Sequence, residues 1–316
     1  MIPGIVFGFI VLIGLAFVGD LKQVGMLILR FKWNIFPLVI ALTLFNYGLR
    51  FIKWHYYIKL VGIKTIAWPE SARLFVGGFP LAVTPGKVGE ALKGVWLYNR
   101  SGLPIAKGLS VVVAERISDG LAVLGLSTLG VLAYPRYWPA FLTILILLLG
   151  IIIISQIRPA ASWLLSIATR IPLIKKIVPG LSEFYEGSFS LFRPIPTVLA
   201  VGLGVVSWLG EGIGFYLILL GLGMEPSAKL ASIAIFILSF STVIGAASAL
   251  PGGIGASEAS IAGMLTLLAG VEPAIALSAT LLIRLATLWF GVTLGLTVWI
   301  LFPELFGFKE KNERVS

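Results

Sequence analysis

The chain has 316 residues, of which 58% are hydrophobic and 12% are charged, and its mean hydropathy is +1.03. Soluble domains carry about 25% charged residues, so this composition excludes a soluble globular enzyme and indicates a membrane protein. The sequence has no cysteine and one histidine, which argues against thiolate or histidine metal sites and against any cofactor or metal. The net charge of +10 is typical of basic cytoplasmic loops rather than of nucleic-acid binding.

Six apolar runs predict membrane crossings. The first, Ile2–Gly19, has neither a basic start nor a cleavage site, so it reads as a retained span rather than a signal peptide. Most of the others approach the ~20 residues that cross the hydrocarbon core. These five are Ile35–Leu49, Leu109–Ala133, Ala140–Ser155, Val198–Leu222 and Ile275–Phe302.

Two further apolar stretches, residues 71–98 and 229–270, are interrupted by Pro-Gly breaks. The break in the first stretch is Thr84-Pro85-Gly86, and the pieces on either side of it are too short for ordinary spans at about 1.5 Å per residue. The second break is Leu250-Pro251-Gly252-Gly253, and its arms are longer. We expect both stretches to form re-entrant hairpins.

Three segments between the spans mix basic with aromatic and aliphatic residues: Asp20–Lys32, Lys53–Pro69 and Arg158–Arg193. This mixture is typical of amphipathic helices and loops in the membrane interface. With two hairpins that return to their own side, thirteen Lys and Arg fall on one side of the membrane, and five fall on the other: Lys22, Arg30, Lys32, Arg136 and Lys229. The excess of basic residues predicts a multi-pass protein of the cell membrane with both termini in the cytoplasm.

The two breaks belong to an internal repeat. The motif P-G-x-[VI]-G occurs at Pro85 and again at Pro251, each time followed by a glutamate, and Glu90 precedes Arg116 by 26 residues just as Glu258 precedes Arg284. Three crossings separate the two copies, so the second is predicted to be inverted, as in many secondary transporters. The alternative is that the breaks merely kink packed helices. The predicted organisation is one transmembrane domain, 1–316, with repeat 1 at about 35–134 and repeat 2 at about 198–302, joined by a span, 138–156, and an interfacial segment, 158–193.

Charged residues inside the apolar stretches are the candidate site. Each costs roughly 2.5–3.5 kcal/mol at a helix centre, so each needs a partner or water. The set is Glu90, Glu115, Arg116, Asp119, Glu211, Glu258 and Arg284. In the functional interpretation, Arg116 and Arg284 bind an anionic head group, and the acids balance charge or carry protons. In the alternative, the same residues form buried salt bridges that fix the repeats against each other.

Residues at the breaks complete the predicted site. Half-helix N-termini favour anions, so backbone groups at the breaks are candidate head-group contacts, together with the side chain of Lys87. The glycines concerned are Gly86, Gly89, Gly253 and Gly255, and the candidate hinges are Pro85 and Pro251. Lys93 also flanks the first break and is a further candidate phosphate contact, and the alternative for both lysines is ordinary snorkelling. Glu211 is the most isolated acid, a candidate proton-binding group or a partner for an arginine such as Arg50.

Three segments, Thr84–Glu90, Glu115–Asp119 and Pro251–Glu258, resemble in order and sequence the motifs of the lysylphosphatidylglycerol synthase transmembrane region, a flippase-like family. The resemblance spans roughly residues 3–303. In the multiple-peptide-resistance proteins this region is the lipid-flipping half, followed by an aminoacyl-transferase domain. The chain stops at Ser316, so the resemblance implies a stand-alone translocase without lipid-aminoacylating activity. Arg284 and Glu211 rest on their position in apolar runs and not on these motifs.

The sequence therefore predicts a flippase that moves an anionic phospholipid or a polyprenyl-phosphate-linked lipid between leaflets, with proton coupling or passive equilibration both open. The sequence has no P-loop or other nucleotide-binding motif, which argues against ATP hydrolysis as the energy source. A membrane transferase is disfavoured by the lack of histidine, cysteine and paired carboxylate motifs. The remaining alternative is a non-catalytic subunit that supports a glycosyltransferase or a lipid-modifying enzyme.

Overall fold

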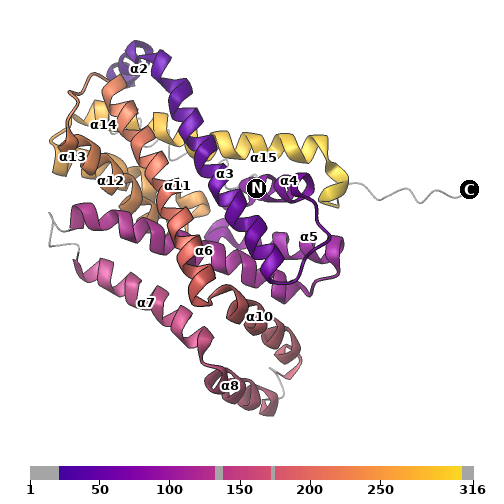
Figure 1. Ribbon diagram of the computed structural model, residues 1–316. Helices are drawn as coiled ribbons and strands as arrows, with labels where there is room; N and C mark the ends of the chain where they lie inside the picture. The colour runs from indigo at the N-terminus through magenta and orange to yellow at the C-terminus, as the bar shows by residue number, and fades with distance from the viewer. Residues whose placement is uncertain (1–20, 132–137, 172–174, 308–316) are drawn as a thin grey trace, which may run out of the picture.

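The computed structural model describes residues 21–131, 138–171 and 175–307, and all regular secondary structure in these ranges is helical (Figure 1). This confirms an all-α polytopic membrane protein. The predicted span Ile2–Gly19 lies outside the described residues. The helices are α2 (Leu21–Arg30), α3 (Phe36–Leu60), α4 (Trp68–Gly77), α5 (Leu92–Ser101), α6 (Ile105–Val131), α7 (Trp138–Gln156), α8 (Arg158–Arg170), α10 (Val178–Leu191), α11 (Pro194–Gly221), α12 (Ala228–Ala247), α13 (Ala256–Ala269), α14 (Pro273–Arg284) and α15 (Phe290–Leu301).

Short helical turns connect several of these helices. Five are 3₁₀ turns: η1 (Trp33–Ile35), η2 (Phe79–Val83), η3 (Pro85–Ala91), η5 (Pro251–Gly253) and η7 (Pro303–Leu305). The sixth, η6 (Leu285–Trp289), is a π-helical turn directly after Arg284, in the middle of the predicted span Ile275–Phe302. Such turns inside α-helices occur frequently at functional sites.

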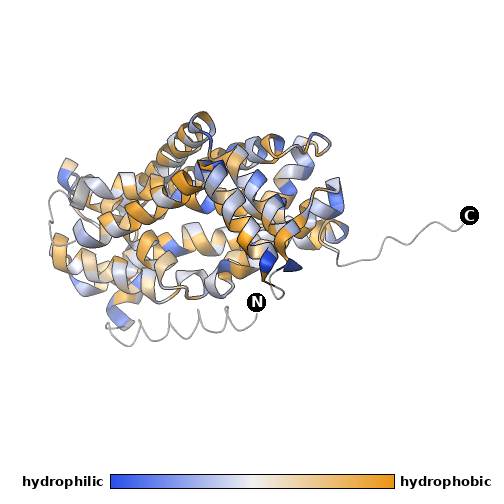
Figure 2. Ribbon diagram, turned by 90° about the horizontal axis from the view of Figure 1, so that it is seen from below, coloured by the Kyte–Doolittle hydropathy of each residue, from blue (hydrophilic) through white to orange (hydrophobic). Residues whose placement is uncertain are grey.

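Five segments of the described chain are long and apolar enough to cross a membrane: 33–60, 194–221, 228–247, 251–269 and 273–301. A sixth is the pair formed by residues 141–156 and 161–170, bent by 82°. Hydrophobic residues are distributed along all of these helices (Figure 2). The interfacial position of the segment that begins at Arg158 stays a prediction. The orientation of the termini stays a prediction.

Helix α3 corrects two predicted boundaries. The span expected at Ile35–Leu49 continues as one helix to Leu60, so the segment expected in the interface, Lys53–Pro69, begins inside a helix. Lys53 is fully buried within the bundle. A hydropathy criterion ends the span at Arg50, because it counts the charges of Arg50 and Lys53 but not the neutralising carboxylate of Asp119 on another helix.

Helix α11 packs on α3, α6 and α12 (Figure 1). Its glycines allow the close approach. A methyl group at Gly212 would lie 2.9 Å from the Ile235 side chain, and one at Gly204 would lie 2.8 Å from Ala122. Small residues at helix contacts are the usual way that membrane helices pack tightly without a hydrophobic driving force.

Both Pro-Gly breaks fold into the interior. The first hairpin has ten-residue arms, α4 and α5, and the second has α12 and α13 as longer arms. The Gly86 N–H donates a hydrogen bond of 2.8 Å to the carbonyl of Ala249, so the two tips touch. Arg284 lies midway along the segment 273–301 and donates to the Gly252 carbonyl at 3.1 Å. The tips therefore lie beside the middle of a span-length helix. The arms of the first hairpin are too short to cross a membrane, whereas each arm of the second is long enough to do so, and the re-entrant course of both hairpins stays a prediction.

The two tips share an unusual backbone. Gly86 and Lys87 have φ values of 58° and 56°, and Gly252 and Gly253 have φ values of 63° and 66°. Two consecutive left-handed residues follow the proline in each break. The division of the chain into two inverted repeats stays a prediction, and this matched geometry supports it.

Candidate functional site

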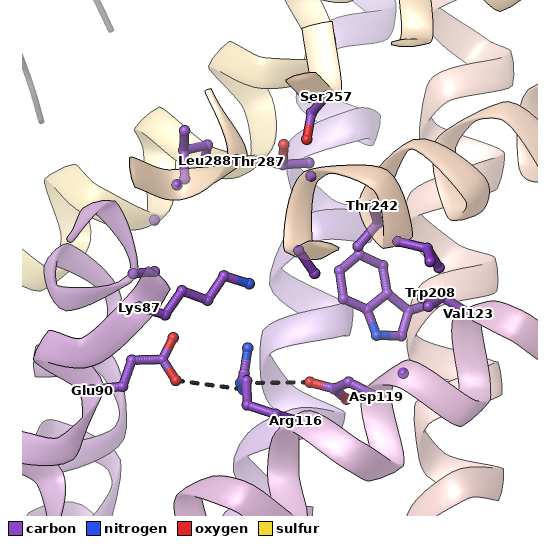
Figure 3. A pocket seen from close by; sticks show the side chains of 18 of the residues that line it. Lys87, Glu90, Arg116, Asp119, Val123, Trp208, Thr242, Ser257, Thr287 and Leu288 are labelled. Atoms are coloured by element: carbon purple, nitrogen blue, oxygen red, sulfur yellow. Dashed lines mark ion pairs between the residues drawn. The ribbon is translucent and has the colours of Figure 1, made fainter. Parts of the chain in front are cut away.

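A cavity of about 550 Å³ lies where the two hairpin tips meet the long helices (Figure 3). Its walls come mainly from α3, α6, α11 and α12 and from the two breaks, and α4, α5, α7, α13 and α14 also contribute. Of the predicted site residues, eight line it: Gly86, Lys87, Glu90, Arg116, Asp119, Glu211, Gly253 and Arg284. Six others lie around it without forming the wall: Pro85, Gly89, Glu115, Pro251, Gly255 and Glu258. The sequence thus brings most of its buried charges to one place.

Arg116 is the most accessible of the paired arginines in the wall. Its Nε lies 3.4 Å from a carboxylate oxygen of Glu90, and its guanidinium lies 3.5 Å from Asp119 and 3.9 Å from Glu115 (Figure 3). Its side chain keeps 29% of its surface exposed toward the cavity, whereas both acids that hold it in Figure 3 are buried. Arg116 is therefore positioned by its partners and still presents part of its guanidinium to an entering anion.

Arg284 is held more tightly. Its Nε lies 2.5 Å from a carboxylate oxygen of Glu258, and its guanidinium donates to the Gly252 carbonyl. The other oxygen of Glu258 accepts the Gly255 N–H at 2.6 Å and so caps the start of α13. Residues 26 positions apart are therefore paired in both halves of the chain. In the second half the pair also braces the hairpin tip.

The acids of α6 are neutralised by α3 and α5. Asp119 pairs with Lys53 and, at 3.3 Å, with Arg50, while Glu115 pairs with Lys93 at 3.1 Å. Lys93 also lies over the ring of Trp54. The snorkelling interpretation of Lys93 is wrong, because its amine is buried against Glu115.

Two basic residues of this network, Arg50 and Lys53, were missed as site residues. They are three positions apart and therefore share a face of α3. That spacing, inside an apolar run that continues through Trp54 and Ile58, is the signal in the sequence. Their role becomes visible once α3 is seen to continue past Leu49.

Two charged side chains in the wall have no ion-pair partner among the described residues. Lys87 forms no ion pair with any residue that the structure describes, and its amine extends into the cavity (Figure 3). Glu211 is 5% exposed and makes neither a hydrogen bond nor an ion pair within the described ranges. Arg50, its expected partner, binds Asp119 and lies 5.6 Å from the ring of Trp208. The interpretation of Glu211 as a partner of Arg50 is therefore wrong at ion-pair distance.

The charges of the wall and their direct partners sum to a small positive value. Within the described residues these are six cations, Arg50, Lys53, Lys87, Lys93, Arg116 and Arg284, and five acids, Glu90, Glu115, Asp119, Glu211 and Glu258. With all of them ionised, one positive charge remains, because Arg50 and Lys53 share Asp119 while Lys87 and Glu211 both lack an ion pair among the described residues. Such an arrangement attracts an anion of low charge. In the described part of the chain, no group of three His, Cys, Asp or Glu has the geometry to hold a metal ion.

The chain belongs to the family described as the lysylphosphatidylglycerol synthase TM region, whose model matches residues 4–295. A UPF0104 membrane protein of Methanothermobacter thermautotrophicus is 28% identical, with 83% of this chain and 82% of the relative covered. A UPF0104 membrane protein of Pyrococcus horikoshii is 26% identical, with coverage of 77% and 80%. The chain is thus a membrane protein of a lipid-related family, as the motifs imply.

Proposed function

We propose that this member of the family moves an anionic lipid between the two leaflets, binding its phosphate-containing head group in the cavity between the hairpin tips. The observation that carries the proposal is the unpaired Lys87 amine beside the partly exposed guanidinium of Arg116, in a buried cavity of positive net charge. Buried charge is costly, and an unpaired lysine at the centre of an apolar bundle is a site for a ligand of opposite charge.

The size and lining of the cavity support a head group as the ligand. A volume of about 550 Å³ is in the range of pockets that hold small organic molecules. Lipid tails do not fit in addition, so they remain among the apolar helices. One wall is apolar, with Val123 of α6, Leu148 of α7 and Leu238 of α12. A polar cleft with an apolar side allows a charged head to pass the ~30 Å core while its tails stay in lipid.

The two hairpins supply the means of alternating access. Each tip begins with a proline that cannot continue the preceding hydrogen-bond pattern, and the tips are joined through one backbone hydrogen bond, from Gly86 to Ala249. In transporters of inverted-repeat design, broken helices meet near the midplane and one half rocks against the other. The tips also pack through Val83 and Ile254, and movement where the tips meet opens the cavity toward one side at a time.

Transport by the purified protein in liposomes tests the proposal. Fluorescent phosphatidylglycerol in the outer leaflet is quenched by dithionite, and the quenched fraction rises above one half when lipid exchanges between leaflets. We expect exchange of phosphatidylglycerol or of a polyprenyl phosphate, well above protein-free liposomes, and at least tenfold slower exchange of phosphatidylcholine. Arg116→Gln removes the exposed cation and is expected to abolish the difference in exchange rate between anionic lipid and phosphatidylcholine.

A matched control is Arg158→Gln, which removes a cation on α8 that pairs with Glu186 at 4.0 Å and remains largely exposed. This variant is expected to exchange anionic lipid at the rate of the unaltered protein. Equal exchange of charged and zwitterionic lipids by folded protein contradicts head-group binding in the cavity. No exchange of any lipid favours a non-catalytic subunit.

A further inference from the structure

We infer that Glu211 is the proton-binding group of the transport cycle and that an anionic head group enters the cavity together with one proton on this carboxyl. The inference rests on the proposed function and adds its coupling. Its basis is the difference between Glu211 and the other four acids of the network. Each of the four has at least one cation within 4.0 Å, whereas Glu211 has none within the described ranges.

The surroundings of Glu211 explain why no cation reaches it. On α3, Tyr47 and Arg50 face it, and the guanidinium of Arg50 is taken by Asp119. On α6 the nearest charge is Asp119 itself, and on α14 it is Arg284, which binds Glu258.

The other cavity-lining residues of α11 and α12 are neutral. Helix α12 presents Ser241 and Thr242 to the cavity, and Trp208 lies one turn before Glu211 on α11. Arg50 and Arg284, the cations that act on Glu211, are thus each bound to another acid, and an ionised Glu211 has no ion-pair partner among the described residues.

A phosphate and an ionised Glu211 compete for the same positive surplus. When Glu211 is ionised, the network holds one net positive charge, and when it is protonated the network holds two. A head group therefore binds more strongly when Glu211 carries a proton, and, by linkage, the bound head group favours protonation of Glu211 by the same factor. Lys87 and Arg116 face the same cavity and are the cations available to bind the phosphate. The strength of this binding therefore depends on whether Glu211 is protonated.

The consequence is symport of a proton with an anionic lipid. Glu211 releases its proton when the head group leaves and the cavity opens to the opposite side. A transmembrane pH difference then drives net movement of lipid, whereas without a difference the lipid equilibrates. No nucleotide and no second ion are required.

Binding of phosphatidylglycerol in detergent micelles, measured from about pH 5 to about pH 9, tests the inference, because the phosphodiester itself does not titrate in this range. For the unaltered protein we expect the affinity to fall by up to about tenfold per pH unit over the range in which Glu211 titrates in the empty cavity. Glu211→Gln mimics the protonated carboxyl, so its affinity is expected to stay high and to vary less than twofold. Glu225→Gln, the same change in an exposed loop, is expected to follow the unaltered profile.

Liposome transport gives the second readout. An acidic exterior is expected to drive inward accumulation of phosphatidylglycerol by the unaltered protein, and Glu211→Gln is expected to equilibrate the lipid without accumulation. Binding with the same pH profile in the unaltered protein and in Glu211→Gln overturns the assignment of Glu211 and leaves the lipid function intact. Absence of binding at every pH overturns both the inference and the proposed function.

Discussion

The Gly86 N–H and the Ala249 carbonyl, 2.8 Å apart, join the two hairpin tips in the centre of the molecule. This contact requires a left-handed conformation at Gly86, with φ of 58°. A side chain at this position has space, since the nearest atom to an added methyl is 3.8 Å away in Val88. The cost of substitution is therefore conformational rather than steric.

Gly86→Ala is expected to lower the free energy of unfolding by about 1–2 kcal/mol, the cost of a left-handed residue with a Cβ. Unfolding in mixed detergent micelles measures it. Gly48→Ala is the control, because Gly48 lies in α3 with nothing within 4 Å of an added methyl, and alanine favours the helix. Equal changes in the free energy of unfolding for the two variants would contradict a requirement for a left-handed residue at Gly86.

Lys87 is the second left-handed residue of the first tip, at φ of 56°, where the second tip has Gly253. Lys87→Gly and Lys87→Ala both remove the cation, and both are expected to slow phosphatidylglycerol exchange at least tenfold. Only the glycine relieves the backbone, so we expect Lys87→Gly to be more stable than Lys87→Ala by about 1 kcal/mol. Transport at the unaltered rate in either variant argues against a phosphate contact of Lys87.

Asp119 neutralises Lys53, whose side chain is 0% exposed. Asp119→Asn leaves this amine without a counter-charge and is expected to cost about 3–5 kcal/mol of stability. The comparison is Glu70→Gln, which breaks a half-exposed pair with Arg100 of 3.2 Å and is expected to cost at most about 1 kcal/mol. The melting temperatures of the two purified variants test this difference. Similar falls in melting temperature would mean that Lys53 is solvated in the membrane-embedded protein.

Arg284 and Glu258 form the bracing pair of the second tip. Arg284→Met alone leaves the buried Glu258 unpaired. It is expected to lower the free energy of unfolding by about 3–5 kcal/mol and so to reduce the yield of folded protein. The double variant Arg284→Met with Glu258→Gln keeps an acceptor for the Gly255 N–H and removes both charges. Its stability is expected to recover by more than half. A double variant no more stable than the single one contradicts the pairing.

Local sequence signals predicted the two breaks and their distance to the arginines. Proline followed by glycine interrupts a helix wherever it occurs, and the spacing of 26 residues from Glu90 to Arg116 recurs from Glu258 to Arg284. The sequence also predicted that each charge in an apolar run needs a partner or water, and Arg284 has Glu258 of α13 beside it.

The sequence did not predict which charged residues on different helices pair with each other. Lys53 reads as an interfacial lysine because hydropathy treats every charge as a cost, and Asp119, which offsets that cost, lies on another helix. The left-handed backbone of Lys87 has no signal in its own residue type, since lysine disfavours it. That Glu211 has no ion pair depends on Arg50 choosing a different acid. The cytoplasmic termini and an enzyme partner remain predictions.

Occupation of the cavity by an anionic head group is the central claim, and the absence of cysteine from the sequence allows it to be measured directly. Ala246 lines the cavity at the end of α12, so Ala246→Cys places one thiol there, while Ser162→Cys places one on the exposed face of α8 as a control. The rate of modification by a small charged thiol reagent is compared in phosphatidylglycerol and phosphatidylcholine nanodiscs. The account predicts at least tenfold slower modification of Ala246→Cys in phosphatidylglycerol, relative to the Ser162→Cys control. Equal relative rates in the two lipids would contradict it.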